Sequence, residues 1–358
     1  MKIGIYYDSL TGKGGAQKVV IQLANELHAD IITSGFDREA EEWLPLKNKV
    51  IDIGNITSKY NAAISFFFET PLRFLFYKNA DYDIQIFCGV SSIFAAKKGK
   101  HNIWFSFTPN RLLYDLREWK LRSVSSSFIR KFFFQTHILL FNAIDQKVVR
   151  ENFRTIIAQT ECVKERIEKY YGLDSKVIYS PLDTSKYKFT KLGDYFLAVS
   201  RLMPEKRIEV VAKAFTKLKD YKLIIVGDGM ERDTIVNIIK NHKNITLLTD
   251  VSEEKLVELY ANCFATIYLP VEEDFGLVPL EGMASGKICI AANEGGCKET
   301  VVHNKTGYLI PPTEQKLIDT VRKLKREKIL KMKNDCILQA KKFDIKNIVK
   351  QWKELIYN

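Results

Sequence analysis

Short apolar segments alternate with amphipathic segments along most of the chain. The apolar segments have the length of β-strands and form two series, at residues 2–7, 30–33, 84–87, 102–107 and 155–159, then at 195–200, 222–226, 245–248, 264–268 and 287–291. Between them, apolar positions recur at helical spacing, for example in residues 16–27, 208–218, 253–261 and 315–325. Strands that alternate with helices predict βαβ units, and therefore parallel sheets covered by helices on both faces.

The series of strands restarts near Tyr195, after a polar segment without periodicity at residues 183–194. A chain of 358 residues is long for one core and sufficient for two domains. We therefore expect an α/β fold of two Rossmann-like, doubly wound parallel-sheet domains, residues 1–185 and 186–342, with a C-terminal helix at about 343–358 packing back on the first. Ligands of such sheets bind beyond the carboxyl ends of the strands, so we expect a site in a cleft between the domains.

The composition, 46% hydrophobic and 27% charged, is that of a soluble globular protein. The 6 cysteines form no Cys-x-x-Cys pair and have no His at metal spacing, which indicates a reducing compartment and no zinc site. The first seven residues are a short apolar run stopped by Asp8, typical of a strand and not of a signal peptide. No uncharged apolar stretch approaches the ~20 residues of a membrane-spanning helix. A cytoplasmic protein is expected.

The net charge of +12 is concentrated in one part of the chain. From Lys97 to Arg150 there are 11 Lys and Arg against 3 Asp and Glu, and phenylalanines are interleaved with the basic Arg130 and Lys131 at residues 128–134. Two interpretations stay open. The segment is a surface that contacts anionic lipid, which would make the protein peripheral on the membrane, or it is a core helix whose basic residues face water. Nucleic-acid binding is not expected.

The segment that indicates chemistry most directly contains two carboxylates, Glu273 and Glu281. Between them is an aromatic–glycine turn, Phe275 and Gly276, followed by a helix of small residues. Carboxylates bind sugar hydroxyls, and the free amides at a helix start bind anions. A sugar joined to a diphosphate requires both.

Basic and glycine-rich loops follow other predicted strands. Arg201 and Lys206 fall on one loop after residues 195–200, where a bidentate guanidinium and a mobile ammonium favour binding of two phosphates over a merely solvated loop. The neighbouring Arg207 is expected to face solvent. The remaining candidate positions are glycines, each of which alone is equally typical of a tight turn: Gly14, Gly15, Gly227 and Gly296. Neither a Walker loop nor a Gly-x-Gly-x-x-Gly fingerprint is present.

Five of these elements occur in a fixed order: Gly-Gly-Ala-Gln-Lys-Val at 14–19, Ser-Arg-Leu…Lys at 200–206, Gly-Asp-Gly at 227–229, Glu-x7-Glu at 273–281 and Gly-Gly-x-x-Glu at 295–299. In this order they resemble the family-4 retaining glycosyltransferases of GT-B architecture, over essentially the whole chain. The resemblance implies a nucleotide-sugar donor, retention of the anomeric configuration, and no cofactor or metal ion, because a basic pair supplies the electrostatic stabilisation.

The resemblance also implies a role for each matched residue. Arg201 and Lys206 would neutralise the departing diphosphate. Glu281 would hold the ribose hydroxyls and Glu273 the hydroxyls of the transferred sugar. The other donor-side positions are Phe275, Gly276, Leu277, Gly227 and Gly296, with Gly14 and Gly15 from the first domain.

Residues 108–115 resemble the His-Thr-Pro-x-Arg-x-x-x-Asp stretch of bacterial and archaeal mannosyltransferases of the family, with Phe107 in place of the His. Arg111 and Asp115 are candidates for acceptor contacts or for a structural ion pair, and the identity of an acceptor base stays open. The resemblance favours mannose from GDP-mannose, moved to a lipid-linked or surface-glycan acceptor. Residues 248–251 depart from the family pattern near the nucleotide base, so a UDP-sugar remains the alternative.

Functions of other classes also remain. A GT-B epimerase or hydrolase would act on a nucleotide sugar without an acceptor. A non-catalytic partner subunit that binds a sugar nucleotide is favoured by Phe107 and opposed by intact Arg201 and Lys206. A dinucleotide oxidoreductase is disfavoured, because neither glycine loop fits its fingerprint.

Overall fold

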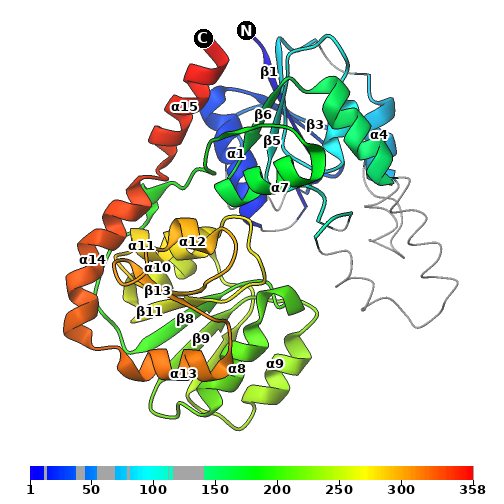
Figure 1. Ribbon diagram of the computed structural model, residues 1–358. Coiled ribbons are helices and arrows are strands. Elements are labelled where there is room, and N and C mark those ends of the chain that lie inside the picture. The colour runs from blue at the N-terminus through cyan, green and yellow to red at the C-terminus, as the bar shows by residue number, and fades with distance from the viewer. Residues whose placement is uncertain are drawn as a thin grey trace, which may run out of the picture. The chain divides into compact units, whose positions relative to one another are not determined.

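The computed structural model describes residues 1–11, 14–37, 45–54, 69–78, 81–111, 113–115 and 141–357 (Figure 1). The chain divides into two compact units, Met1–Tyr179 with Val349–Asn358, and Ser180–Ile348. Each unit is built on one parallel sheet with α-helices packed against it. The predicted pair of Rossmann-like parallel-sheet domains is therefore confirmed. The basic Phe-rich segment at 128–134, with Arg130 and Lys131, lies outside the described residues.

In the first unit, the described residues form a 7-stranded sheet in the order β3-β2-β1-β4-β5-β6-β7. Its strands are β1 (Ile3–Tyr7), β2 (Asp30–Thr33), β3 (Val50–Asp52), β4 (Ile84–Phe87), β5 (Asn102–Ser106), β6 (Thr155–Ala158) and β7 (Lys176–Val177). The helices of this unit include α1 (Gly15–Leu27), α4 (Thr70–Phe76), α7 (Glu161–Tyr171), the helical residues 141–152, the 3-10 turn η2 (Ser92–Ala95) and the end of α15 (Ile345–Tyr357). The central strands are buried on both faces, which explains their continuous apolar sequences.

The C-terminal helix is fixed to the first unit by a tryptophan. Trp352, on α15, is fully buried, and its ring lies edge-on to Phe105 of β5 at 4.9 Å between ring centroids. An aromatic pair of this kind adds to the stabilisation that comes from removing the indole from water.

A buried carboxylate ties the loop after β5 to the helical residues 141–152 and to α7. Oδ2 of Asp145 accepts hydrogen bonds from Oη of Tyr114 at 2.8 Å and from Oη of Tyr171 at 2.5 Å. Burial raises the pKa of Asp145 from 3.8 to about 6, although the two tyrosine hydrogen bonds oppose the shift. The folded state therefore binds this proton more tightly than the unfolded chain does.

Replacing Asp145 with asparagine is expected to remove a pH dependence of stability. The stabilisation from the neutral carboxyl is fully present below the unfolded pKa and is lost as pH rises through the folded pKa, by up to about 3 kcal/mol. The introduced amide would stay neutral, and its single oxygen can accept from both tyrosines. The Tm of Asp145→Asn minus that of wild type should therefore increase between pH 4 and pH 8 in scanning calorimetry. A difference that stays constant with pH would contradict this assignment.

In the second unit, the described residues form a 6-stranded parallel sheet in the order β10-β9-β8-β11-β12-β13. Its strands are β8 (Tyr195–Val199), β9 (Lys222–Val226), β10 (Ile245–Leu248), β11 (Ala265–Tyr268), β12 (Cys289–Ala292) and β13 (Gly307–Ile310). One group of packed helices comprises α8 (Ile208–Thr216), α9 (Arg232–Ile239) and α13 (Glu314–Lys323). A second group comprises α10 (Glu253–Asn262), α11 (Leu277–Ala284), α12 (Cys297–Thr300) and α14 (Arg326–Lys341).

The boundary between the units falls at Tyr179 and Ser180, a few residues before the expected end of the first domain at 185. Hydrogen bonds explain the difference. The amide of Leu182 donates to the carbonyl of Phe343 at 2.9 Å, and the amide of Ile345 donates back to the carbonyl of Leu182 at 2.9 Å. The polar segment at residues 183–194 is the linker that the sequence predicted. Leu182, just before it, is paired with the segment between α14 and α15, within the second unit.

None of the helices in the described ranges, 1–11, 14–37, 45–54, 69–78, 81–111, 113–115 and 141–357, is long and apolar enough to cross a membrane.

Candidate active site

Most of the candidate residues predicted from the sequence lie on four loops of the second unit, at the side of its sheet where the strands end. They follow the carboxyl ends of β8, β9, β11 and β12, at residues 200–207, 227–229, 269–276 and 293–296. Because the strands are parallel, these loops emerge at the same edge, which is where open α/β sheets bind ligands. The structure thus gathers at this edge Arg201, Lys206, Gly227, Glu273, Phe275, Gly276 and Gly296.

The Glu273 carboxylate is the centre of the polar contacts at this edge. Its Oε2 accepts a hydrogen bond from Nζ of Lys206 at 2.6 Å and another from Oη of Tyr268 at 2.7 Å. The side chains of Lys206 and Glu273 are 16% and 15% exposed, so the ion pair is mostly screened from water but still reachable by a ligand. Burial first, and then the charge of Glu273, raises the pKa of Tyr268 well above its usual range, so its hydroxyl keeps the proton that it donates.

Arg201 lies at the start of the same loop as Lys206, and its side chain is exposed. Within the part of the chain that the structure describes, no ion pair joins its guanidinium to an acidic residue. The sequence placed Arg201 and Lys206 on one loop. The structure adds that Lys206 is held by Glu273, whereas Arg201 projects into solvent.

Two of the glycines predicted to contact substrate, Gly227 and Gly296, also permit neighbouring loops to approach closely. The amide of Gly296 donates to the carbonyl of Glu273 at 2.7 Å, and a Cβ at Gly296 would lie 2.6 Å from the carbonyl oxygen of Asp274. Gly227 has φ 151, and a Cβ there would lie 1.8 Å from the carbonyl oxygen of Ser200. A side chain at either position would displace the loop that carries a candidate catalytic residue.

The sequence predicted that Arg207 faces solvent, but the structure shows its guanidinium bound to two other loops. From a left-handed backbone conformation, φ 51, its Nη1 donates to the carbonyl of Pro270 at 3.2 Å and to Oε2 of Glu294 at 2.9 Å. The same carboxylate oxygen accepts from the amide of Glu272 at 3.3 Å. Arg207 therefore connects the loops after β8, β11 and β12 and supports the backbone beside Glu273.

Glu281 lies on α11 and is only 5% exposed. Its Oε1 accepts from Oη of Tyr187 at 3.1 Å, and its Oε2 accepts from Oη of Tyr260 at 2.7 Å. Burial, and next the charge of Glu281, raises the pKa of both tyrosines well above the usual range. The predicted ribose carboxylate is thus bound on both oxygens to tyrosine hydroxyls, one from the linker and one from α10.

The start of α11 carries the remaining donor-side candidates of this unit. Gly276 is the N-cap residue and Leu277 is the first residue of the helix. The ring of Phe275 is buried, with its centroid 5.6 Å from that of Phe343. This contact fixes the turn between Glu273 and the start of α11, and the first amides of an α-helix have no acceptor within the helix.

The candidates in the first unit also follow strand ends. Gly14 is the N-cap of α1 and Gly15 its first residue. After β5, both Nε and Nη2 of Arg111 lie 2.9 Å from Oδ2 of Asp115, an oxygen that is also 3.8 Å from Nε of Arg166. Arg111 and Asp115 therefore form an ion pair within the first unit, one of the two interpretations of the sequence.

Phe107 replaces the His of the mannosyltransferase motif. Its ring centroid lies 4.9 Å from that of Phe105 and 6.2 Å from that of Tyr7. The side chain at this position is therefore part of an aromatic cluster at the ends of β5 and β1 and offers no group that transfers a proton.

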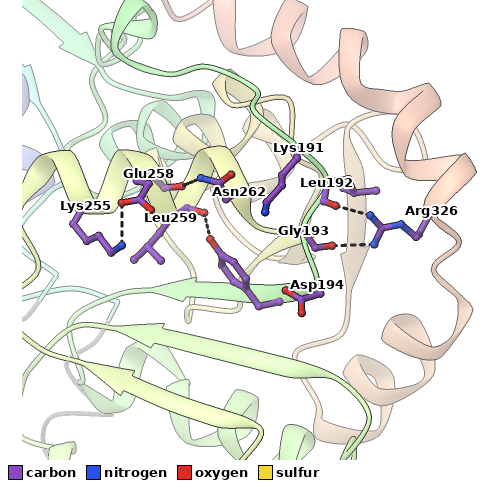
Figure 2. A pocket seen from close by; sticks show the side chains of 10 residues that line it. Lys191, Leu192, Gly193, Asp194, Lys255, Glu258, Leu259, Asn262 and Arg326 are labelled. Atoms are coloured by element: carbon purple, nitrogen blue, oxygen red, sulfur yellow. Dashed lines mark hydrogen bonds and ion pairs between the residues drawn. The ribbon is translucent and has the colours of Figure 1, made fainter.

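A separate surface cavity of about 600 Å³ lies near the amino ends of the strands of the second sheet, around the start of β8 (Figure 2). The guanidinium of Arg326 donates to the carbonyls of Leu192 and Gly193, and Oη of Tyr195 donates to the carbonyl of Leu259 at 2.8 Å. No residue of the candidate active site lines this cavity. Its polar groups mainly hold the linker against α10 and α14.

The tyrosines that bind the two candidate carboxylates were not predicted from the sequence. Tyr268 is the last residue of an apolar strand and looks like part of it. Tyr187 and Tyr260 are separated from Glu281 by 94 and 21 positions in the chain. The only local signal was the tyrosine at the carboxyl end of β11, five residues before Glu273.

Comparison with known proteins gives this site its context. Residues 183–343 match the family model for glycosyl transferases group 1, and this range contains all four loops at the edge of the second sheet. Residues 183–343 therefore resemble the group 1 glycosyl transferases.

Two relatives of this chain have names that refer to different sugars. N-acetyl-alpha-D-glucosaminyl L-malate synthase of Bacillus anthracis is 28% identical over 237 residues, 62% of this chain and 62% of that protein. Alpha-1,3/1,6-mannosyltransferase ALG2 of Dictyostelium discoideum is 25% identical over 306 residues, 71% of this chain and 69% of that protein. The chain thus aligns with less than two thirds of the first relative.

The fold of the chain also occurs among solved structures. Anabaena Alr3699/HepE in complex with UDP and glucose has a TM-score of 0.77 to this chain, at 18% identity, with 100% of both chains covered. The two Rossmann-like units therefore have the GT-B fold, as the sequence motifs predicted.

Proposed function

We propose that the protein transfers a hexose from a nucleotide-diphosphate sugar to a glycan acceptor, with retention of the anomeric configuration. The observation that supports this most directly is the contact of Lys206 with Glu273 at the carboxyl edge of a glycosyl transferase domain. A cation suited to a phosphate lies 2.6 Å from a carboxylate suited to a sugar hydroxyl. This is the pairing that a sugar bound to a diphosphate requires.

In this mechanism, the bond from the anomeric carbon to the donor phosphate oxygen breaks, and an acceptor hydroxyl oxygen bonds to the same face of that carbon. The acceptor proton passes to the departing phosphate oxygen, so no enzyme base is needed and Phe107 is compatible with turnover. Arg201 and Lys206 stabilise the negative charge that develops on the leaving diphosphate. Glu273 holds the sugar hydroxyls, and the proposal includes no metal ion or other cofactor.

For the donor, we propose mannose from GDP-mannose. The supporting features are residues 108–115, which match the mannosyltransferase motif except at Phe107, and relatives named as mannosyltransferases. A UDP-sugar is the alternative, supported by the complex of the structural neighbour with UDP-glucose. The acceptor is proposed to be a lipid-linked or surface glycan, reached by peripheral contact with the cytoplasmic face of a membrane.

A thermal-shift panel of GDP-, UDP- and ADP-sugars tests the donor, because a ligand that binds only the native state raises Tm. We expect GDP-mannose to give the largest rise, and incubation with a lipid-linked acceptor to yield a glycosylated product and GDP. Sugar released or epimerised without acceptor would indicate a hydrolase or an epimerase. Binding without turnover on any acceptor would indicate a non-catalytic subunit, and no rise with any nucleotide sugar would contradict the proposal.

A further inference from the structure

One carboxylate oxygen of Glu273 receives two hydrogen bonds from separate elements. Lys206 belongs to the 3-10 turn η4 (Pro204–Lys206), and Tyr268 is the last residue of β11. Both donate to Oε2 of Glu273, at 2.6 and 2.7 Å. The two hydrogen-bond donors differ in mobility. The ammonium of Lys206 ends a flexible four-carbon stem, whereas the ring of Tyr268 is 7% exposed and fixed by its burial.

Lys206 has two competing anions in the proposed reaction. Its ammonium is bonded to Glu273, and the same group is assigned to the diphosphate of the donor. The diphosphate carries more negative charge than a carboxylate and gains more as the bond to the sugar breaks, so it attracts the ammonium most strongly at the transition state. Glu273 would then lose one of its two hydrogen-bond donors at the moment when the sugar hydroxyls must be held in place.

We propose that Tyr268 is the positioning residue of Glu273, because its hydroxyl holds Oε2 in place when Lys206 turns toward the donor diphosphate. This inference rests on the proposed function, which assigns Glu273 to the sugar and Lys206 to the phosphates. The raised pKa of Tyr268 is consistent with it, since the hydroxyl keeps its proton at neutral pH and remains a hydrogen-bond donor.

The substitution Tyr268→Phe tests this role with little change in shape. It removes only the hydroxyl and keeps the ring, whose centroid lies 5.8 Å from Nζ of Lys206. The matched control is Tyr195→Phe, which removes a hydroxyl that donates to the carbonyl of Leu259 at 2.8 Å at the opposite edge of the sheet. Both variants lose one tyrosine hydrogen bond in the same unit.

Two measurements separate positioning from general stability. We expect Tyr268→Phe to lower kcat/KM for the nucleotide sugar by about ten-fold or more, the usual effect of losing a hydrogen bond to a charged group. Its affinity for the nucleoside diphosphate alone, which has no sugar for Glu273 to hold, should stay within about two-fold of wild type. The control should keep both values, and the Tm of the two variants without ligand should be similar.

Equal kcat/KM values for Tyr268→Phe and Tyr195→Phe would overturn the inference while leaving the proposed function intact. A loss of nucleoside-diphosphate affinity as large as the loss of transfer would also overturn it, because the hydroxyl would then support the whole loop and not the sugar carboxylate. If the wild-type protein neither binds nor turns over a nucleotide sugar, the proposed function fails, and the inference fails with it.

Discussion

Replacing Lys206 with alanine is expected to lower kcat for sugar transfer by about 10²- to 10³-fold, the range seen when one preorganised charge-stabilising group is removed from an active site. The ammonium lies on the loop after β8, where a departing diphosphate would develop its charge. Arg201→Ala should have a comparable effect, because its exposed guanidinium is the second cation of the same loop. Steady-state and single-turnover assays with the preferred nucleotide sugar measure both variants.

The fold should tolerate the loss of Lys206. Glu273 would keep its hydrogen bond from Tyr268, and its side chain is 15% exposed, so the charge left behind remains in contact with water. We expect a destabilisation of about 1 to 3 kcal/mol, because a mostly screened carboxylate loses one of its partners. The matched control is Lys222→Ala, which removes the same charge from an exposed pair with Asp194 at the start of β9. Turnover at the wild-type rate in either Lys206→Ala or Arg201→Ala would refute the phosphate role.

The central strands of both sheets could be predicted from the sequence because they are buried on both faces. β1, β8 and β11 are continuous apolar segments for this reason, and their order alone indicated parallel sheets. The strands β3, β7 and β13 were missed. They lie at the edges of the sheets, and β7 comprises only Lys176 and Val177, too short for a pattern to be recognised.

The loops of the site could be predicted, but the bonds between them could not. Glycines and charges after successive strands placed Arg201, Lys206 and Glu273 at one edge, because parallel strands share that edge. Which donor meets which oxygen depends on how the loops fold back on one another. Arg207 illustrates this limit, since its partner Glu294 is separated from it by 87 positions and nothing local indicates the contact.

Replacing Glu281 with alanine is expected to lower the free energy of unfolding of the second unit by about 3 to 5 kcal/mol. The substitution leaves the hydroxyls of Tyr187 and Tyr260 without their acceptor inside the protein, at about 1–3 kcal/mol each, and leaves a cavity as well. Glu281→Gln should cost less, because an amide still accepts from one tyrosine and donates to the other. Hydrogen exchange of α11 and β11 amides under native conditions measures the change in this unit.

The comparison of the two variants also tests how Glu281 serves the proposed donor. If the carboxylate acts mainly by joining the linker, α10 and α11, Glu281→Gln should bind a nucleoside diphosphate nearly as well as wild type. If it holds the ribose, as the family resemblance implies, affinity should fall about ten-fold or more at an unchanged Tm, because hydrogen bonds from ribose to a charged acceptor would be lost. Glu209→Ala, which breaks an exposed pair with Lys213, is the control and should change neither value.

Since both oxygens of Glu281 already accept hydrogen bonds from buried tyrosines, we expect the structural effect to be the larger one. Full stability of Glu281→Ala would contradict this expectation and leave the ribose contact as the reason for the carboxylate.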